Sequence, residues 1–123
     1  MLRNYKDLLV WQKSYKLCLL IYKVSKIFPK DEQYILVPQI RRAAVSIPSN
    51  TAEGYGRKTT KEYIQFLYIA YGSLCELETQ ILLANDLGYL DADKFKDIQA
   101  AIEEVERMLK ALIRSLEGKG LKS

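Results

Sequence analysis

The side chains that could carry chemistry in this chain are carboxylates, two thiols and lysines, because its 123 residues include no histidine. Without histidine, catalytic triads built on imidazole are excluded. Most zinc sites and the Glu-x-x-His pairs of di-iron helical bundles are excluded for the same reason. An enzyme of this composition would have to work with carboxylates, a thiol or lysine alone.

The remaining groups do not form a catalytic pattern. Glu76 and Glu78 are two residues apart, so on a helix they point in different directions and cannot pair as acid and base. Cys18 and Cys75 lack the spacing of metal ligands, and each lies in an apolar helical pattern where a buried, reduced and inert thiol is expected. We therefore expect no enzymatic activity, no metal and no cofactor.

The basic residues are concentrated in the first half of the chain. Residues 1–58 contain 11 Lys and Arg against 4 Asp and Glu, net +7, whereas residues 59–117 contain 6 against 11, net −5. Lys16, Lys23 and Lys30 recur every seven residues, which on a helix places them in one stripe. The candidate nucleic-acid-binding residues are Lys13, Lys16, Lys23, Lys26, Lys30, Arg41, Arg42, Arg57 and Lys58.

Two hypotheses follow from this charge pattern. In the first, the lysine stripe forms a positive surface that binds the phosphates of RNA or DNA without sequence specificity, extended by the later basic residues if the fold brings them together. In the second, the basic half of one subunit meets the acidic half of its neighbour in a head-to-tail homo-oligomer. For any single lysine, simple solvation is the plain alternative. Tyr55, Tyr63, Tyr68 and Tyr71 could stack on bases, but tyrosines at helical spacing more often belong to a core or an interface.

Apolar residues recur with a helical period over most of the chain, which predicts four helices. The first spans residues 7–28 and ends before Pro29; the second runs from about Asp31 to about residue 54, with Pro38 and Pro48 each removing a backbone donor. The third spans residues 59–88, opening on a capping box. The fourth begins at its N-cap, Asp91, and ends before Gly118.

Short loops between long amphipathic helices predict antiparallel neighbours. The expected fold is all-α, an antiparallel up-down-up-down four-helix bundle in residues 1–118, followed by a short basic tail in residues 119–123 that is expected to fray.

The middle of the chain, "IPSNTAEGYGRKTTKEY", is small and polar, unlike the helical stripes around it. Its small residues predict close approach of the second helix to its neighbours, and Ser46, Asn50 and Glu53 fall within about one helical turn of one another. Gly54 and Gly56 predict the exit from the helix. The expected role is structural, a close-packed helix end with a satisfied polar cluster.

The first helix is apolar over a wider arc than one core needs, since Trp11, Leu19, Tyr22 and Val24 cannot all face inward. Exposed apolar patches of this kind commonly mark interfaces, so we expect a homo-oligomer. The longest strongly apolar run, residues 17–22, is far shorter than the roughly 20 residues that cross a bilayer, and no signal-peptide pattern opens the chain. We expect a cytoplasmic protein.

Four segments together carry a resemblance to a known family: "LLVWQKSYKLCLLIYKVSKIFP", "QIRRAAVSIPSNTAEGYGR", "GSLCELETQILLANDLGYL" and "MLKALIRSL". In this order and spacing, the chain resembles the four-helix bundle proteins encoded in intervening sequences of bacterial 23S ribosomal RNA genes. The residues that match the family pattern are Trp11, Gln39, Ser46, Asn50, Glu53, Gly54, Ser73 and Glu76. Thr51, where the family usually has an apolar residue, and Pro38, where it more often has a small polar one, depart from the pattern.

The resemblance implies an antiparallel four-helix bundle that assembles as a homo-oligomer, with pentameric rings as the expected form. It also implies kinship to the accessory proteins of diversity-generating retroelements, which bind nucleic acid and a reverse transcriptase. For most members of the family the biological role is unknown.

Overall fold

Four α-helices make up most of the computed structural model, which describes residues 3–122 and the side chains up to residue 118. They are α1 (Leu9–Ser25), α2 (Leu36–Tyr55), α3 (Thr60–Asp86) and α4 (Ala92–Lys122). Two short 3-10 helices, η1 (Tyr5–Asp7) and η2 (Lys30–Tyr34), precede α1 and α2. Residues 3–122 contain no strand, so the fold class is all-α with four helices, consistent with a four-helix bundle.

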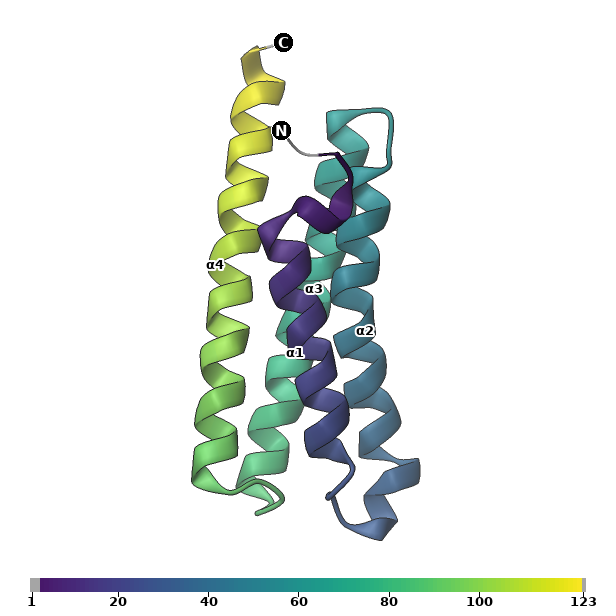
Figure 1. Cartoon of the computed structure of the whole chain (residues 1–123), viewed down its shortest axis with the longest axis vertical. Helices are drawn as coiled ribbons and strands as arrows, with labels where there is room; N and C mark the ends of the chain where they lie inside the picture. The colour runs from purple at the N-terminus through teal and green to yellow at the C-terminus, as the bar shows by residue number, and fades with distance from the viewer. Residues whose placement is uncertain (1–2, 123) are drawn as a thin grey trace.

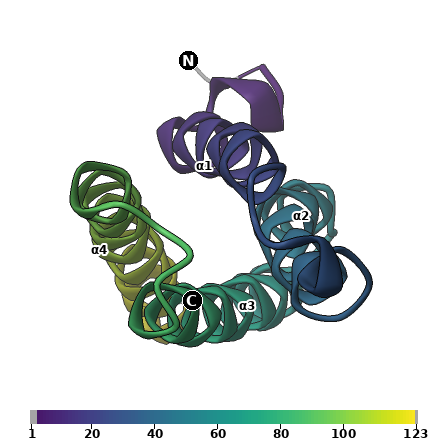
Figure 2. The same ribbon diagram turned by 90° about the horizontal axis from the view of Figure 1, so that it is seen from below.

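The helices stand side by side, and the loops that connect them alternate between the two ends of the molecule (Figure 1). Seen end-on, the helices follow one another in chain order around the bundle, so α1 and α3 lie on a diagonal (Figure 2). In agreement with this view, α1 and α3 each pack on α2 and α4, and no Cα atom of α1 lies within 8 Å of one in α3. The outward sides of α1 and α3 therefore belong to opposite faces of the chain.

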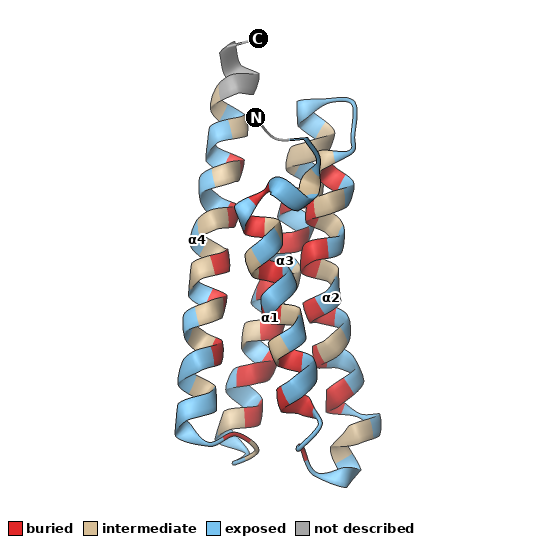
Figure 3. Ribbon diagram, in the orientation of Figure 1, coloured by how far each residue is buried: buried red, intermediate tan, exposed pale blue. Residues whose placement is uncertain are grey.

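The core is a continuous apolar stripe along the inward side of each helix (Figure 3). Its largest fully buried side chains are Leu17, Ile21, Val37, Ile40, Ile47, Leu67, Leu74, Leu77, Ile81, Ile98, Ile102 and Leu109. Their spacing of three and four residues is the one that predicted the helices.

Local signals set the ends of α3 and the start of α4 as predicted. The Thr59 hydroxyl accepts a hydrogen bond of 3.1 Å from the Glu62 backbone N–H, and Gly88 closes the following turn with a φ of +83°. The Asp91 carboxylate accepts a hydrogen bond of 2.8 Å from the Lys94 backbone N–H. The Thr59 and Asp91 side chains satisfy backbone N–H groups that have no partner inside their helices. The positive φ of Gly88 is a conformation that favours glycine.

Other predicted boundaries were wrong by several residues. Instead of a helix from residue 31, residues 30–34 form η2, and α2 begins at Leu36. Pro38 is the third residue of α2, where a backbone N–H would have no partner inside the helix, so its missing N–H costs nothing there. The first helix ends at Ser25, and residues 26–28 form turns. Phe28 precedes Pro29, and the proline ring disfavours a helical conformation of the residue before it. The fourth helix continues through Gly118 to Lys122, because glycine weakens a helix without breaking it. Fraying of residues 119–123 stays a prediction, and residue 123 lies outside the described residues.

Candidate nucleic-acid interface

Five of the predicted basic residues are exposed, on α1, on the loop after it and on α2. We call Lys16, Lys23, Lys26, Lys30 and Arg42 the basic face. All five side chains are exposed, and none has a carboxylate oxygen within 4 Å among the described residues. The heptad spacing places Lys16 and Lys23 on one edge of α1. Lys30 begins η2, and Arg42 lies in the second turn of α2.

Two other predicted residues are engaged between helices. The Lys13 ammonium forms a 3.5 Å ion pair with Glu104 of α4. The Arg41 Nε donates a 2.9 Å hydrogen bond to the Ser25 hydroxyl, Nη2 donates to the Tyr22 backbone carbonyl at 3.3 Å, and the guanidinium lies 4.8 Å from the centre of the Tyr22 ring. These contacts tie α1 to its neighbours, so both cations have a structural role.

The last two predicted residues lie away from the basic face. Arg57 and Lys58 occupy the turn between α2 and α3, and α2 with its 20 residues separates them from Lys30 by about 30 Å. Arg57 also pairs with Glu53 at 3.6 Å and lies 4.6 Å from the centre of the Phe66 ring. The fold therefore does not join these residues to Arg41 and Arg42 in one basic surface.

The polar residues of the predicted cluster hold α2 against α3. The Ser46 and Ser73 hydroxyls are hydrogen-bonded at 2.7 Å, and the Asn50 amide donates to the Ser46 carbonyl at 2.8 Å and to its hydroxyl at 2.9 Å. Glu53, predicted in the same cluster, is exposed and pairs with Arg57 instead. The Ser46–Ser73 bond crosses between the helices, and the two Asn50 bonds lie within α2, so the cluster is a structural contact.

Close packing of α2 on α3 continues above this cluster. A Cβ atom added at Gly54 would lie 2.9 Å from Phe66 Cβ and 3.2 Å from the Tyr63 carbonyl oxygen. Real Cβ atoms essentially never approach another atom as closely as 2.9 Å, so the lack of a side chain at Gly54 permits this contact.

The other residues of the family pattern have different surroundings. Trp11 is half-buried, with its ring 5.3 Å from that of Tyr5 and 5.0 Å from that of Tyr15. Gln39 is exposed and donates to the Ile35 carbonyl at 3.3 Å. Glu76 is exposed on α3 with no cation within 4 Å among the described residues.

The two cysteines differ in exposure. Cys18 is half-buried, and burial raises the pKa of its thiol, which disfavours the nucleophilic thiolate. Cys75 is exposed on α3, so the prediction that both thiols are buried was wrong for this one. The described residues contain no group of three or more metal-ligating side chains, and no described helix has the length and apolar character to cross a membrane.

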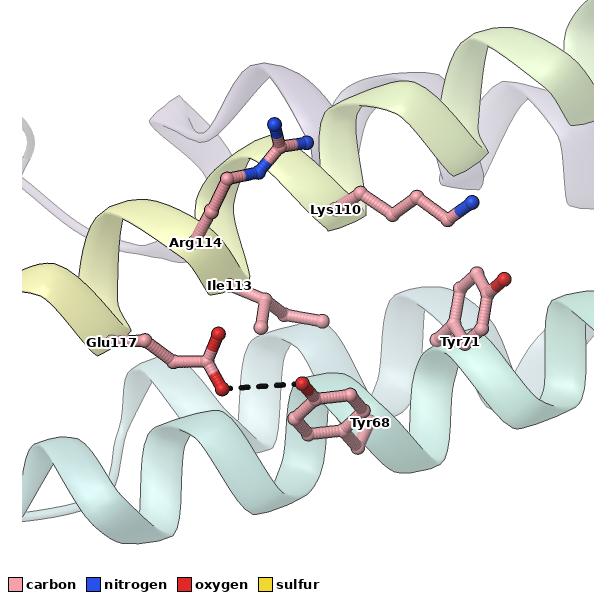
Figure 4. Close-up of a pocket in the computed structure, with 6 residues that line it drawn as sticks. All are labelled: Tyr68, Tyr71, Lys110, Ile113, Arg114 and Glu117. Atoms are coloured by element: carbon pink, nitrogen blue, oxygen red, sulfur yellow. Dashed lines mark hydrogen bonds between the residues drawn. The ribbon is translucent and has the colours of Figure 1, made fainter.

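Most of the tyrosines proposed for base stacking are engaged. Tyr55 and Tyr63 are half-buried and meet edge to face at 6.1 Å, and burial raises the pKa of Tyr63 to about 12. Between α3 and α4, a pocket of about 280 Å³ contains Tyr68 and Tyr71 (Figure 4). Tyr68 donates a 3.2 Å hydrogen bond to Glu117, and the Lys110 ammonium lies 5.5 Å from the centre of the Tyr71 ring. The Tyr71 hydroxyl donates a 3.5 Å hydrogen bond to Glu106, with which Lys110 pairs at 3.4 Å. Of the four tyrosines, Tyr68 alone is exposed.

One surface was missed by the sequence reasoning. Five large apolar residues on α3 and at its C-terminal cap are each 43–51% accessible: Tyr68, Ile69, Leu82, Leu83 and Leu87. The signal was present in the sequence, because residues 62–93 contain six carboxylates and neither Lys nor Arg. Such a segment combines apolar and acidic surface in a chain that is basic overall.

Comparison with known proteins gives the chain a family. The model of the family described as 23S rRNA-intervening sequence protein matches residues 6–111. A solved structure from Bacteroides thetaiotaomicron, of a protein with unknown function from the S23 ribosomal protein family, has a TM-score of 0.80 and 23% identity. The similarity covers 85% of this chain and 98% of that chain, and it supports the fold. No curated protein matches the chain. Because the family model spans most of its length, the chain belongs to the 23S rRNA-intervening sequence protein family.

Proposed function

We propose that this chain is a non-enzymatic, cytoplasmic protein that assembles as a homo-oligomer of antiparallel four-helix bundles and binds nucleic acid with low sequence specificity. The observation that carries the proposal is the basic face, whose five cations are exposed and have no carboxylate oxygen within 4 Å among the described residues. The alternating loops in Figure 1 support the antiparallel order, and the resemblance implies a pentameric ring as the form of the oligomer.

Phosphate groups are the ligand that this face fits best. Exposed ammonium groups that are not ion-paired keep their full charge, and contacts with a polyanion release the counterions condensed on it. From Leu8 to Lys30 the chain has five lysines and no carboxylate, so α1 itself contributes no anion that would repel a phosphate backbone.

The geometry favours binding without base recognition. Four of the five cations are lysines, which contact phosphate as point charges, whereas bidentate base recognition usually needs a free guanidinium. A groove of about 440 Å³ lies beside Arg42 and is lined partly by Tyr22, Pro38 and Val45. The Tyr22 ring in this groove is covered by Arg41, so that face is closed to a base.

Binding of labelled structured RNA and duplex DNA across a salt series tests the proposal. The variant Lys30→Glu/Arg42→Glu changes two cations of the basic face, and Lys96→Glu/Arg107→Glu is the charge-matched control on α4. We expect the first variant to lose most of the affinity, and the slope of log affinity against log salt to decrease by about 0.9 for each duplex-DNA phosphate that the variant no longer neutralises. Equal losses of affinity in both variants would show that only the net charge of the chain matters. Absence of binding by the native chain at low salt would refute the proposal.

An alternative function is favoured by the apolar side of α3. Exposed apolar patches commonly mark protein interfaces, and the five residues there are each 43–51% accessible. In this alternative the protein is an oligomeric scaffold with no nucleic-acid role, and the resemblance implies a reverse transcriptase as its protein partner. An oligomer that stays intact in low salt and binds neither RNA nor DNA would favour this function.

A further inference from the structure

The outward side of α3 has the pattern of a helix that packs against another helix. Gln65, Ile69, Gly72, Glu76, Thr79 and Leu83 follow one another at alternating steps of four and three residues, the spacing of a coiled-coil seam. All six residues are exposed. A Cβ atom added at Gly72 would meet nothing within 4 Å, so the seam is open at its centre.

The outward side of α1 has the same pattern. Gln12, Tyr15, Leu19, Tyr22 and Lys26 are exposed and follow at steps of three and four residues. Leu19 is the most exposed apolar residue of this seam, with 57% of its surface accessible. Lys16 and Lys23 lie beside the seam.

The two sides carry opposite charge. The helix α1 has three lysines and no carboxylate. From Glu62 to Asp86, α3 has four carboxylates and no Lys or Arg. Pairing α3 with α3 of a second copy would bring carboxylates together, and pairing α1 with α1 would bring lysines together. Charge therefore disfavours both symmetric arrangements and favours contact between unlike helices.

Within one chain this contact cannot form, because α1 and α3 lie on a diagonal and expose opposite sides (Figure 2). We propose that the seam of α3 in one copy docks on the seam of α1 in a second copy, in a head-to-tail arrangement. Because the two surfaces differ, a row of copies always has one free α1 seam at one end and one free α3 seam at the other. The assembly closes into a ring when the rotation between copies brings these two seams together.

The heights of the residues along the bundle agree with this pairing. Arg41 of α2 contacts Ser25 of α1, and Ser46, five residues farther along α2, contacts Ser73 of α3. With a rise of about 1.5 Å per residue along each helix, these contacts place Glu76 at about the height of Lys23. Through α4, the contacts Lys13–Glu104 and Tyr71–Glu106 place it at about the height of Lys16. If neighbouring copies stand upright side by side, Glu76 of one copy meets the edge of α1 where these two lysines lie.

This inference rests on the homo-oligomer in the proposed function, but it does not require nucleic-acid binding. It assigns Lys16 and Lys23 to the contact between copies. Lys30 lies in η2, beyond the C-terminal end of α1, and Arg42 lies on α2, so neither belongs to the seam of α1 or to the seam of α3. The two proposals can therefore be tested with different residues.

Charge reversal tests the pairing directly. Glu76→Lys places a cation on α3, and Lys16→Glu/Lys23→Glu places anions on α1; each change is at an exposed site and should leave the helices folded, which circular dichroism checks. We expect each variant to raise the dissociation constant of the oligomer at least about tenfold, measured by light scattering after gel filtration. The triple variant Lys16→Glu/Lys23→Glu/Glu76→Lys should restore the native mass, and mixing the two single-face variants should produce larger species than either alone.

The apolar part of the seam is tested with Leu83→Ser, and Ile35→Ser is the matched control, since Ile35 is 62% exposed and lies outside both seams. We expect the first change to weaken assembly and the control to leave it unchanged. Native mass in both charge variants, or failure of the triple variant to reassemble, would overturn the pairing of α1 with α3. A native chain that is strictly monomeric at micromolar concentration would overturn the homo-oligomer as well, whereas a loss of nucleic-acid binding alone would affect only the basic face.

Discussion

The substitution Gly54→Ala tests whether the close approach of α2 to α3 is as tight as the structure shows. The new methyl group would lie 2.9 Å from Phe66 Cβ, 3.1 Å from Tyr63 Cδ1 and 3.2 Å from the Tyr63 carbonyl oxygen. Two of these atoms are fixed to the backbone of α3, so rotation of a side chain cannot relieve the contact. One helix has to move away from the other.

Two opposing effects determine the size of the change. Alanine favours a helix over glycine by up to about 1 kcal/mol. Overpacking in a close contact costs about 1–3 kcal/mol, because neighbouring groups must shift. We therefore expect Gly54→Ala to lower the free energy of unfolding by up to about 2 kcal/mol.

The matched control is Gly118→Ala in α4, where a Cβ would meet nothing within 4 Å, so only the gain in helix propensity applies. Urea unfolding followed by circular dichroism, at one fixed protein concentration, gives the free energy of unfolding of both variants. The difference between them isolates the overpacking cost of about 1–3 kcal/mol. A Gly54→Ala protein as stable as the Gly118→Ala control would refute the tight contact.

Three further predictions concern stability. Thr59→Ala removes the hydroxyl that caps α3 and should lower the free energy of unfolding by about 1 kcal/mol, measured by urea unfolding, whereas Thr59→Ser should retain most of it. Gly88→Ala has free space around it but forces a side chain onto a residue with a φ of +83°, so a loss of about 1–2 kcal/mol is expected from backbone strain alone; an unchanged urea midpoint would contradict this. Burial raises the pKa of Tyr63 to about 12, so above about pH 10, where an unfolded tyrosine ionises, the folded state binds more protons and stability falls as the pH rises towards 12. Tyr63→Phe should remove part of this alkaline loss, measured by urea unfolding at a series of pH values.

The parts of the fold that sequence reasoning predicted well depend on short-range interactions. The capping box at Thr59, the positive φ of Gly88 and the cap at Asp91 each involve residues within four positions of one another. Their physical cause is the unsatisfied backbone groups at helix ends, which are the same in every protein. The beginning of α2 was missed because a proline is tolerated in the first turn of a helix, so Pro38 alone did not show on which side the helix begins.

The candidate site could be predicted only as a set of residue types. The sequence identified the basic residues, but it did not show that Lys13 pairs with Glu104 or that Arg41 is held by Ser25 and Tyr22. These contacts join different helices, and they depend on how the helices pack. Exposure of Cys75 was missed for a related reason, because a helix with apolar residues on two sides does not reveal which side faces the core.

The segregation of charge along the chain has different consequences at different surfaces of the bundle. Because α1 packs on α4, lysines of α1 lie near carboxylates of α4, and the Lys13–Glu104 ion pair is one result. The outward lysines of α1 and the outward carboxylates of α3 cannot meet in this way, since the two helices lie on a diagonal. One side of the chain is therefore apolar and basic, and the opposite side is apolar and acidic. Charge of opposite sign on two sides of one molecule favours alignment of neighbouring copies in one direction, and this alignment should weaken as salt screens the charges.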